Sequence, residues 1–124
     1  MEFSTSADGT KIAFERRGSG ESILLVHGTT GSKQSWALVA PILAEHFSVV
    51  AMDRRGHGES GAGLSYSIDL EAQDIVSVID AVGDAVHLVG HSGGARAALT
   101  AALHTDRLFP RSLRATHRGA PLPG

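Results

Sequence analysis

The clearest chemical signal in the sequence is the pentapeptide Gly-His-Ser-Gly-Gly at residues 90–94. It matches the pattern G-x-S-x-G, in which a serine lies on a sharp turn between a strand and a helix and projects its hydroxyl into open space. An aliphatic run precedes the pentapeptide and an alanine-rich run follows it, as this context requires. The backbone packs so closely around such a turn that only glycine fits at positions 90 and 94. Ser92 is therefore predicted to be a nucleophile, above a helix N-terminus that stabilises negative charge.

A second segment with chemical potential lies at residues 24–31, where the run Leu-Leu-Val ends in the small-residue loop His-Gly-Thr-Thr-Gly. Acyl transfer needs two N–H donors aimed at the developing oxyanion. We expect the backbone N–H of Gly93, directly after the nucleophile, to be one donor and that of Thr29 to be the other. The pentapeptide alone could be a glycine-rich turn with an incidental serine, and its pairing with this second segment weighs against that alternative.

These loops need a scaffold that brings the ends of several strands together. Short aliphatic runs bounded by glycine-rich segments predict buried strands, at residues 22–26, 47–52 and 85–89. Helical periodicity and alanine content predict helices, at residues 33–45 with a kink or restart at Pro41, 67–82 and 93–103. The turn pair Asp8-Gly9 predicts a hairpin of residues 2–6 with 11–15. Alternating strands and helices predict an α/β fold with a parallel sheet, whose ligands lie at the carboxyl ends of the strands.

Three motifs in the same order resemble those of the α/β-hydrolase superfamily. They are VHGTTG at residues 26–31, followed by Trp36, VVAMDRRGHGES at 49–60 and VGHSGG at 89–94. The resemblance covers about residues 1–105 and is nearest to small carboxylesterases, cofactor-free haloperoxidases (perhydrolases) and carbon–carbon bond hydrolases.

The resemblance implies a three-layer α/β-hydrolase fold with Ser92 as nucleophile and oxyanion donors at Thr29 and Gly93. It also implies a mostly structural role for the loop at residues 53–60. Relatives that act on epoxides or haloalkanes place Asp at the nucleophile position, so Ser92 argues against those activities.

The sequence departs from the family after the helix that follows Ser92. The family places the catalytic acid and histidine after later strands, whereas residues 112–124 contain no Val, Ile, Phe, Tyr or Trp. We therefore expect the fold to be truncated after this helix, with a hydrolase portion at residues 1–105 and an irregular basic tail at 106–124. A truncated gene or a change of frame near residues 109–115 would explain this. The strand at 85–89 would then be an unpaired edge, prone to self-association.

Other acid and base residues of the sequence are candidate partners of Ser92. Asp106 is expected about 20 Å away at ~1.5 Å of helix rise per residue, and His117 has no scaffold to bring it back. Asp53 and His27 share an edge with Ser92, so they form an improvised triad as the alternative to a structural role for His27. His91 adjoins Ser92, but successive strand residues point to opposite faces, which argues against it as the base.

Other features of the sequence argue against a cofactor, a metal, a nucleic acid or a membrane as a partner of this protein. The glycines at residues 56–61 fit G-x-G-x-x-G, but a loop rather than a helix follows them, so no nucleotide cofactor is expected. The seven histidines lack metal-binding spacing, so no metal is expected. A formal net charge of −2 gives no reason to expect nucleic acid or an anionic membrane as partner. The longest aliphatic run is too short to span a bilayer and no signal peptide is recognised, so a cytoplasmic location is expected.

These features predict a serine hydrolase that acts on a small-molecule carboxylic ester through an acyl-Ser92 intermediate. Perhydrolase (haloperoxidase) and carbon–carbon hydrolase chemistry on the same scaffold are alternatives. An inactive fragment that lacks its catalytic acid and base is the alternative of a different class, and a small binding protein is a third.

Overall fold

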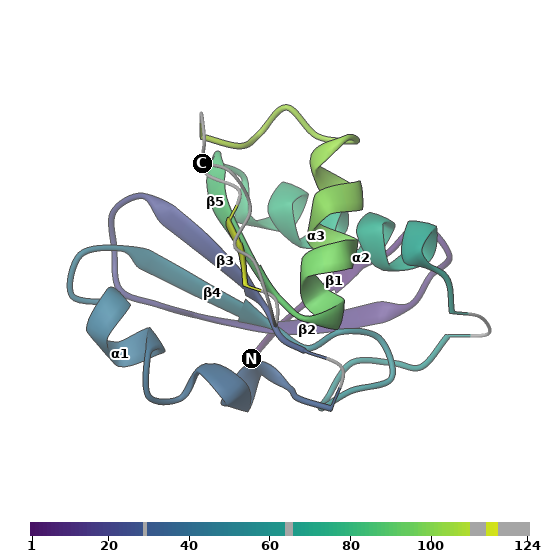
Figure 1. Ribbon diagram of the computed structural model, residues 1–124, viewed down its shortest axis with the longest axis horizontal. Coiled ribbons are helices and arrows are strands. Elements are labelled where there is room, and N and C mark those ends of the chain that lie inside the picture. Colours follow the sequence, from purple (N-terminus) through teal and green to yellow (C-terminus); the bar gives the residue numbers. More distant parts are fainter. Residues whose placement is uncertain (29, 64–65, 110–113, 117–124) are drawn as a thin grey trace.

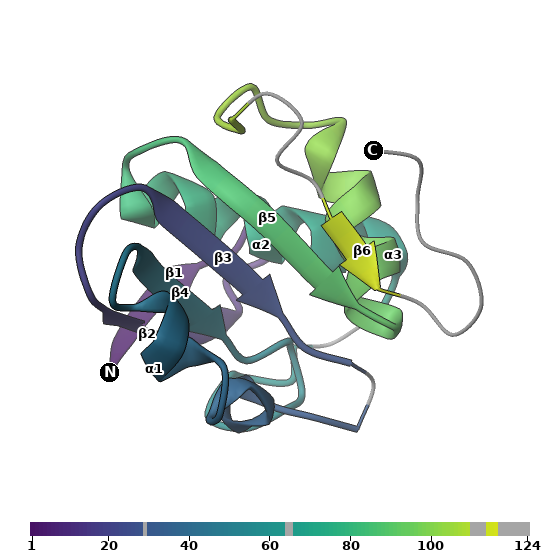
Figure 2. The same ribbon diagram turned by 60° about the vertical axis from the view of Figure 1, so that its left-hand side comes forward.

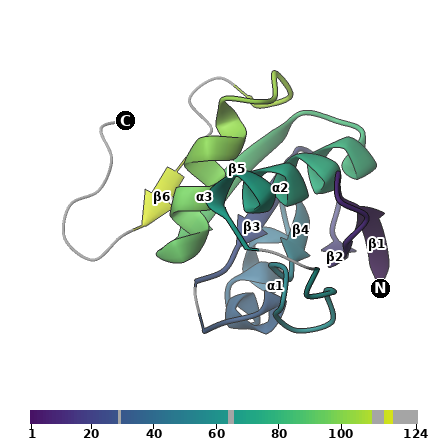
Figure 3. The ribbon, with the colours of Figure 1, turned by 90° about the vertical axis from the view of Figure 1, so that its right-hand side faces the viewer.

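A six-stranded mixed sheet forms the centre of the computed structural model, which describes residues 1–28, 30–63, 66–109 and 114–116. Helices cover both faces of this sheet, so the described chain has three layers (Figures 1 and 3). The strands are β1 (Glu2–Thr5), β2 (Lys11–Arg17), β3 (Ser22–Val26), β4 (Ser48–Met52), β5 (Val86–His91) and β6 (Arg114–Thr116). The helices are η1, a 3-10 helix (Lys33–Trp36), α1 (Ala40–Leu43), α2 (Ile68–Val82) and α3 (Gly93–Ala102).

The sheet order β1-β2-β4-β3-β5-β6 brings the predicted site residues to one edge. β1 and β2 form the predicted antiparallel hairpin, and β3 lies parallel between β4 and β5. Val26 of β3 is opposite Met52 of β4 on one side and Gly90 of β5 on the other. The segments that carry Ser92 and the small-residue loop therefore leave neighbouring strands at the same level, as expected for the carboxyl ends of parallel strands.

The larger part of the core lies between the sheet and the helices α2 and α3. Every residue of β3 is buried, which fits a central parallel strand covered on both faces. α2 begins after Ser67, whose side chain accepts the backbone N–H of Leu70, and it ends at Gly83 in the left-handed conformation. The predicted helix over 67–82 is thus confirmed to within one residue. None of the helices within the described ranges is long and apolar enough to cross a membrane.

The opposite face of the sheet carries a smaller cluster beneath η1 and α1. Residues 33–45 do not form one helix, because η1 ends at Trp36 and the chain restarts as α1 with Pro41 in its first turn. This confirms the restart expected at Pro41, which lacks the N–H that a helix interior requires. The buried members of the cluster are Ile23, Leu25, Ala40 and Val49.

Strand β6 overturns two expectations about the end of the chain. Residues 106–124 were expected to be irregular, but Arg114–Thr116 pair in parallel with Val89–His91 of β5 (Figure 2). A further bridge joins Val86 to Leu108, so β5 is not the unpaired edge that the sequence predicted. The prediction rested on the lack of aliphatic side chains, whereas strand pairing uses backbone N–H and C=O groups that every residue but proline offers. Residues 117–124 lie outside the described chain.

Candidate active site

Ser92 lies on the turn between β5 and α3, where the G-x-S-x-G pattern predicted it. Its φ of 54° and ψ of −119° make it the single non-glycine residue with positive φ in the described ranges. The residue is partly exposed and lines a cavity of about 500 Å³. No hydrogen bond to its hydroxyl is found among the described residues, so the oxygen is available to a ligand in this cavity.

The glycines on either side of Ser92 are required by close backbone packing. A Cβ atom at Gly94 would overlap the carbonyl oxygens of Val26 and His27 at the end of β3. A Cβ atom at Gly90 would lie 2.7 Å from the Cα atom of Ala95. Both glycines therefore let α3 start directly against the sheet, which confirms the packing reason given for the pattern.

The loop after β3 closely approaches the strand-to-helix turn at residues 90–94, here called the elbow. A Cβ atom built on Gly28 would lie 3.5 Å from the Cβ atom of Ser92, and Gly28 and Thr30 both line the Ser92 cavity. Gly93 is the first residue of α3, so its N–H is one of those that the helix leaves unpaired. Thr29, the other expected oxyanion donor, lies outside the described residues, and the convergence of the two N–H groups stays a prediction.

His27 is fully buried, and its ring is committed to the backbone. Its Nε2 atom accepts the N–H of Arg54 at 2.9 Å, which leaves Nδ1–H to donate to the carbonyl of Gly28 at 2.6 Å. Burial is the main cause that lowers the pKa of His27 below its ordinary value. The structure therefore does not form the improvised triad, because neither ring nitrogen is left to accept a proton from Ser92.

This arrangement predicts that stability falls in mild acid. With the folded-state pKa of His27 below the unfolded value, the unfolded chain binds the proton first, so stability is greatest above about pH 6.5 and declines below it. We expect a slope of up to ~1.4 kcal/mol per pH unit in urea unfolding between about pH 6.5 and the folded-state pKa. His104→Gln, at an exposed position, should keep the slope and His27→Gln should lose it. Equal slopes in both variants would contradict the assignment.

Asp53 holds the loop after β4 to the loop after β3. Its carboxylate accepts the N–H of Lys33 at 2.6 Å, the Lys33 ammonium at 3.0 Å and the N–H of Glu59 at 2.9 Å. Burial alone would raise the pKa of Asp53, but the Glu59 and Lys33 donors outweigh it and hold the pKa below its usual range. A Cβ atom at Gly58 would overlap this carboxylate, so the glycine pattern of residues 56–61 serves loop packing.

Two buried arginines next to Asp53 were missed by the sequence analysis. Arg55 has no exposed side-chain surface and pairs with Asp74 of α2 and with Asp8 of the β1–β2 turn. Arg54 pairs with Glu71 in the first turn of α2 at 2.7 Å. These pairs tie the loop after β4 to α2 and to the hairpin.

Of the other candidate partners of Ser92, Asp106 is not brought to it. Asp106 is exposed beyond the far end of α3, and His117 lies outside the described residues. His91 lines the Ser92 cavity, and the expectation that it is not the base of Ser92 stays a prediction.

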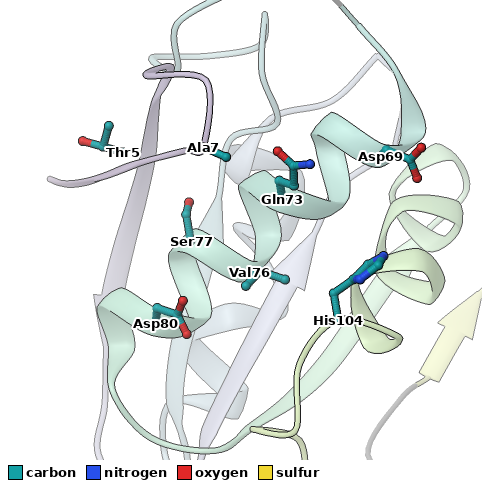
Figure 4. Close-up of a pocket in the computed structure, with 8 residues that line it drawn as sticks. All are labelled: Thr5, Ala7, Asp69, Gln73, Val76, Ser77, Asp80 and His104. Atoms are coloured by element: carbon teal, nitrogen blue, oxygen red, sulfur yellow. The ribbon is translucent and has the colours of Figure 1, made fainter.

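A second cavity, of about 650 Å³, lies away from Ser92 (Figure 4). It runs along the outer side of α2, between Thr5 and Ala7 of the hairpin and His104 after α3. Although it is larger, neither Ser92 nor the loop after β3 contributes to it. We therefore place the candidate active site in the smaller cavity.

Comparisons with known proteins identify the family to which this fold belongs. Residues 23–120 match the model of a family described as the alpha/beta hydrolase family. A putative carbamate hydrolase, RutD, from Caulobacter segnis is 45% identical over 71% of this chain and 35% of its own length. An N-formylmaleamate deformylase from Pseudomonas putida is 41% identical over 78% of this chain and 38% of its own length.

A solved structure of similar fold is the esterase EaEST from Exiguobacterium antarcticum. It superimposes with a TM-score of 0.78 at 33% identity, over 82% of this chain and 39% of the esterase. The chain thus spans less than two-fifths of the length of each of these three proteins. With the family match over residues 23–120 and the three-layer architecture, the chain belongs to the alpha/beta hydrolase family.

Proposed function

We propose that this chain supplies the nucleophile of a serine hydrolase that cleaves carboxylic esters through an acyl-Ser92 intermediate. The observation that carries the proposal is the backbone conformation of Ser92, which presents an unbonded hydroxyl to a cavity at the N-terminus of α3. Strained conformations of this kind cluster at catalytic sites. The esterase among the similar structures supports an ester as the substrate class.

In the proposed reaction, the Ser92 oxygen forms a bond to the acyl carbon, and the bond from that carbon to the alcohol oxygen breaks. The serine proton leaves with the alcohol. Water then attacks the acyl-enzyme, releases the carboxylic acid and restores the hydroxyl. During both attacks the N–H of Gly93 and the N-terminus of α3 face the charge that develops on the carbonyl oxygen.

Selective labelling by an organofluorophosphonate tests the nucleophile. Ser92 displaces fluoride from phosphorus and releases HF, and intact-mass analysis with peptide mapping identifies the modified residue. We expect slow labelling of the 124-residue chain, with Ser92 modified at least about tenfold faster than any other serine, because backbone donors face the phosphoryl oxygen on which negative charge develops. Ser19→Ala, in the exposed loop before β3, should keep the reaction, whereas Ser92→Ala should abolish it. Equal labelling in the two variants would contradict the proposal.

Steady-state turnover by residues 1–124 alone is expected to be negligible. No imidazole among the described residues is hydrogen-bonded to Ser92, and a positioned general base contributes about 10²–10⁴ to the rate of such reactions. Hydrolysis of p-nitrophenyl acetate should therefore be slower than ordinary enzyme turnover by about that factor. An ordinary turnover number that disappears in Ser92→Ala would show instead that a base reaches the serine from outside the described residues.

A further inference from the structure

The cavity beside Ser92 has one apolar wall. Its described lining comes from the loop after β3, the elbow and the segment of η1 and α1. Most of these residues are glycine or polar, and the two with sizeable apolar side chains are Trp36 and Val39. Trp36 is half-buried against the core cluster on this face of the sheet, and Val39 is 45% exposed. Both come from the short segment that follows the small-residue loop.

This wall is held in place by the same contacts that fix the loop. Lys33, the first residue of η1, donates both its N–H and its ammonium group to the buried carboxylate of Asp53. The side chain of Ser32 accepts the N–H of Gln34, and the N–H of Val39 donates to the carbonyl of Trp36. The apolar wall is thus formed before any ligand binds, which reduces the entropy lost on binding.

The described lining of this cavity includes no Asp, Glu, Lys or Arg. A charged group on a substrate would therefore lose its hydration without gaining a partner of opposite charge, which is costly. An uncharged apolar group would be removed from water against an indole ring and an isopropyl group, which is favourable. The volume of about 500 Å³ lies in the range of small-molecule sites.

We propose that Trp36 and Val39 are the specificity-determining residues of the Ser92 site and select substrates with an uncharged, apolar chain. This inference rests on the proposed function, because it assumes that the reaction takes place at Ser92. The apolar chain of the substrate can belong to the acyl group or to the alcohol of the ester. The same apolar wall would recognise it in either case.

A series of p-nitrophenyl alkylphosphonates tests the proposal on the 124-residue chain. Ser92 attacks phosphorus, p-nitrophenolate leaves and the serine proton passes to solvent, so absorbance reports the rate and intact mass reports the product. One arm lengthens the alkyl group on phosphorus from methyl to hexyl, which mimics the acyl chain. The other lengthens the retained alkoxy group, which mimics the alcohol, and a carboxylate-ended hexyl group tests charge.

In the wild-type chain we expect one of the two arms, alkyl or alkoxy, to show the preference. Its hexyl reagent should react at least about tenfold faster than its methyl reagent, since each buried methylene raises the rate about fourfold. The carboxylate-ended reagent should fall back to the methyl rate. Trp36→Ala should reduce the hexyl-to-methyl ratio to about threefold or less, and Trp36→Phe should restore most of it. Val39→Ala, which removes little from the core, should lower the ratio as well.

Leu38 provides the matched control, because it lies between the two wall residues, is 87% exposed and does not line the cavity. Leu38→Ala should leave every rate unchanged. A hexyl-to-methyl ratio that is the same in wild type, Trp36→Ala and Val39→Ala would overturn the specificity inference alone. Failure of the methyl reagent to modify Ser92 would overturn the proposed function, and this inference with it.

Discussion

Replacing Gly94 with alanine is expected to destabilise the chain by at least about 3 kcal/mol, because the new methyl group has no space. It would overlap the carbonyl oxygens of Val26 and His27, which belong to the backbone and cannot move aside by changing rotamer. α3 would have to shift away from β3, and Ser92 would move with it. Urea unfolding followed by circular dichroism should show this loss, together with slower phosphonate labelling of Ser92.

Gly61 provides a matched control for the glycine-to-alanine change. A Cβ atom there would lie 3.5 Å from the nearest atom, the Cγ2 atom of Thr10, which is an ordinary van der Waals contact. Gly61→Ala should therefore change the free energy of unfolding by less than about 1 kcal/mol. Similar losses for Gly94→Ala and Gly61→Ala would show that backbone contact at the elbow is not the cause.

Replacing Asp74 with alanine is expected to cost about 3–5 kcal/mol, because it leaves the buried guanidinium of Arg55 with an incomplete set of partners. Both oxygens of Asp74 accept hydrogen bonds of 2.7 Å from Arg55, and Oδ1 also accepts the hydroxyl of Ser6. Asp8 would remain as the described carboxylate that faces the cation. The loss is measured as a lower midpoint in urea and a lower Tm.

The exposed pair between Arg16 and Glu2 tests whether burial is what makes the difference. Both side chains remain more than a third exposed, so solvent screens their attraction. Glu2→Ala should cost less than about 1 kcal/mol. If Asp74→Ala cost no more than Glu2→Ala, Arg55 would have to be hydrated or paired in a way that the described contacts do not include.

Much of this architecture could be predicted from the sequence because local rules decide it. Aliphatic runs located β3, β4 and β5, and the apolar spacing of residues 67–82 located α2. The elbow was predictable for a similar reason. Its glycines and serine are adjacent in the chain, so one short pattern contains both the strained residue and the space that it requires.

The long-range polar contacts could not be predicted in the same way. Arg55 finds its partners 19 and 47 residues away, and many carboxylates in the sequence offered an equally good charge. One weak signal was present in the sequence, because Asp74 directly precedes Ile75, an apolar residue of the α2 stripe. The structure shows that both residues are buried. β6 gave no signal, because backbone pairing places little demand on residue type.

The positive φ of Ser92 sets stability against reactivity at one residue. Glycine adopts this backbone conformation freely, whereas a residue with a side chain is disfavoured there by about 1–3 kcal/mol. Ser92→Gly should therefore unfold at an equal or higher urea concentration than wild type while losing all reaction with phosphonates. Without selection for the hydroxyl, stability alone would favour glycine at this position. Under the proposed function, serine at position 92 is retained for its hydroxyl although glycine would give a more stable fold.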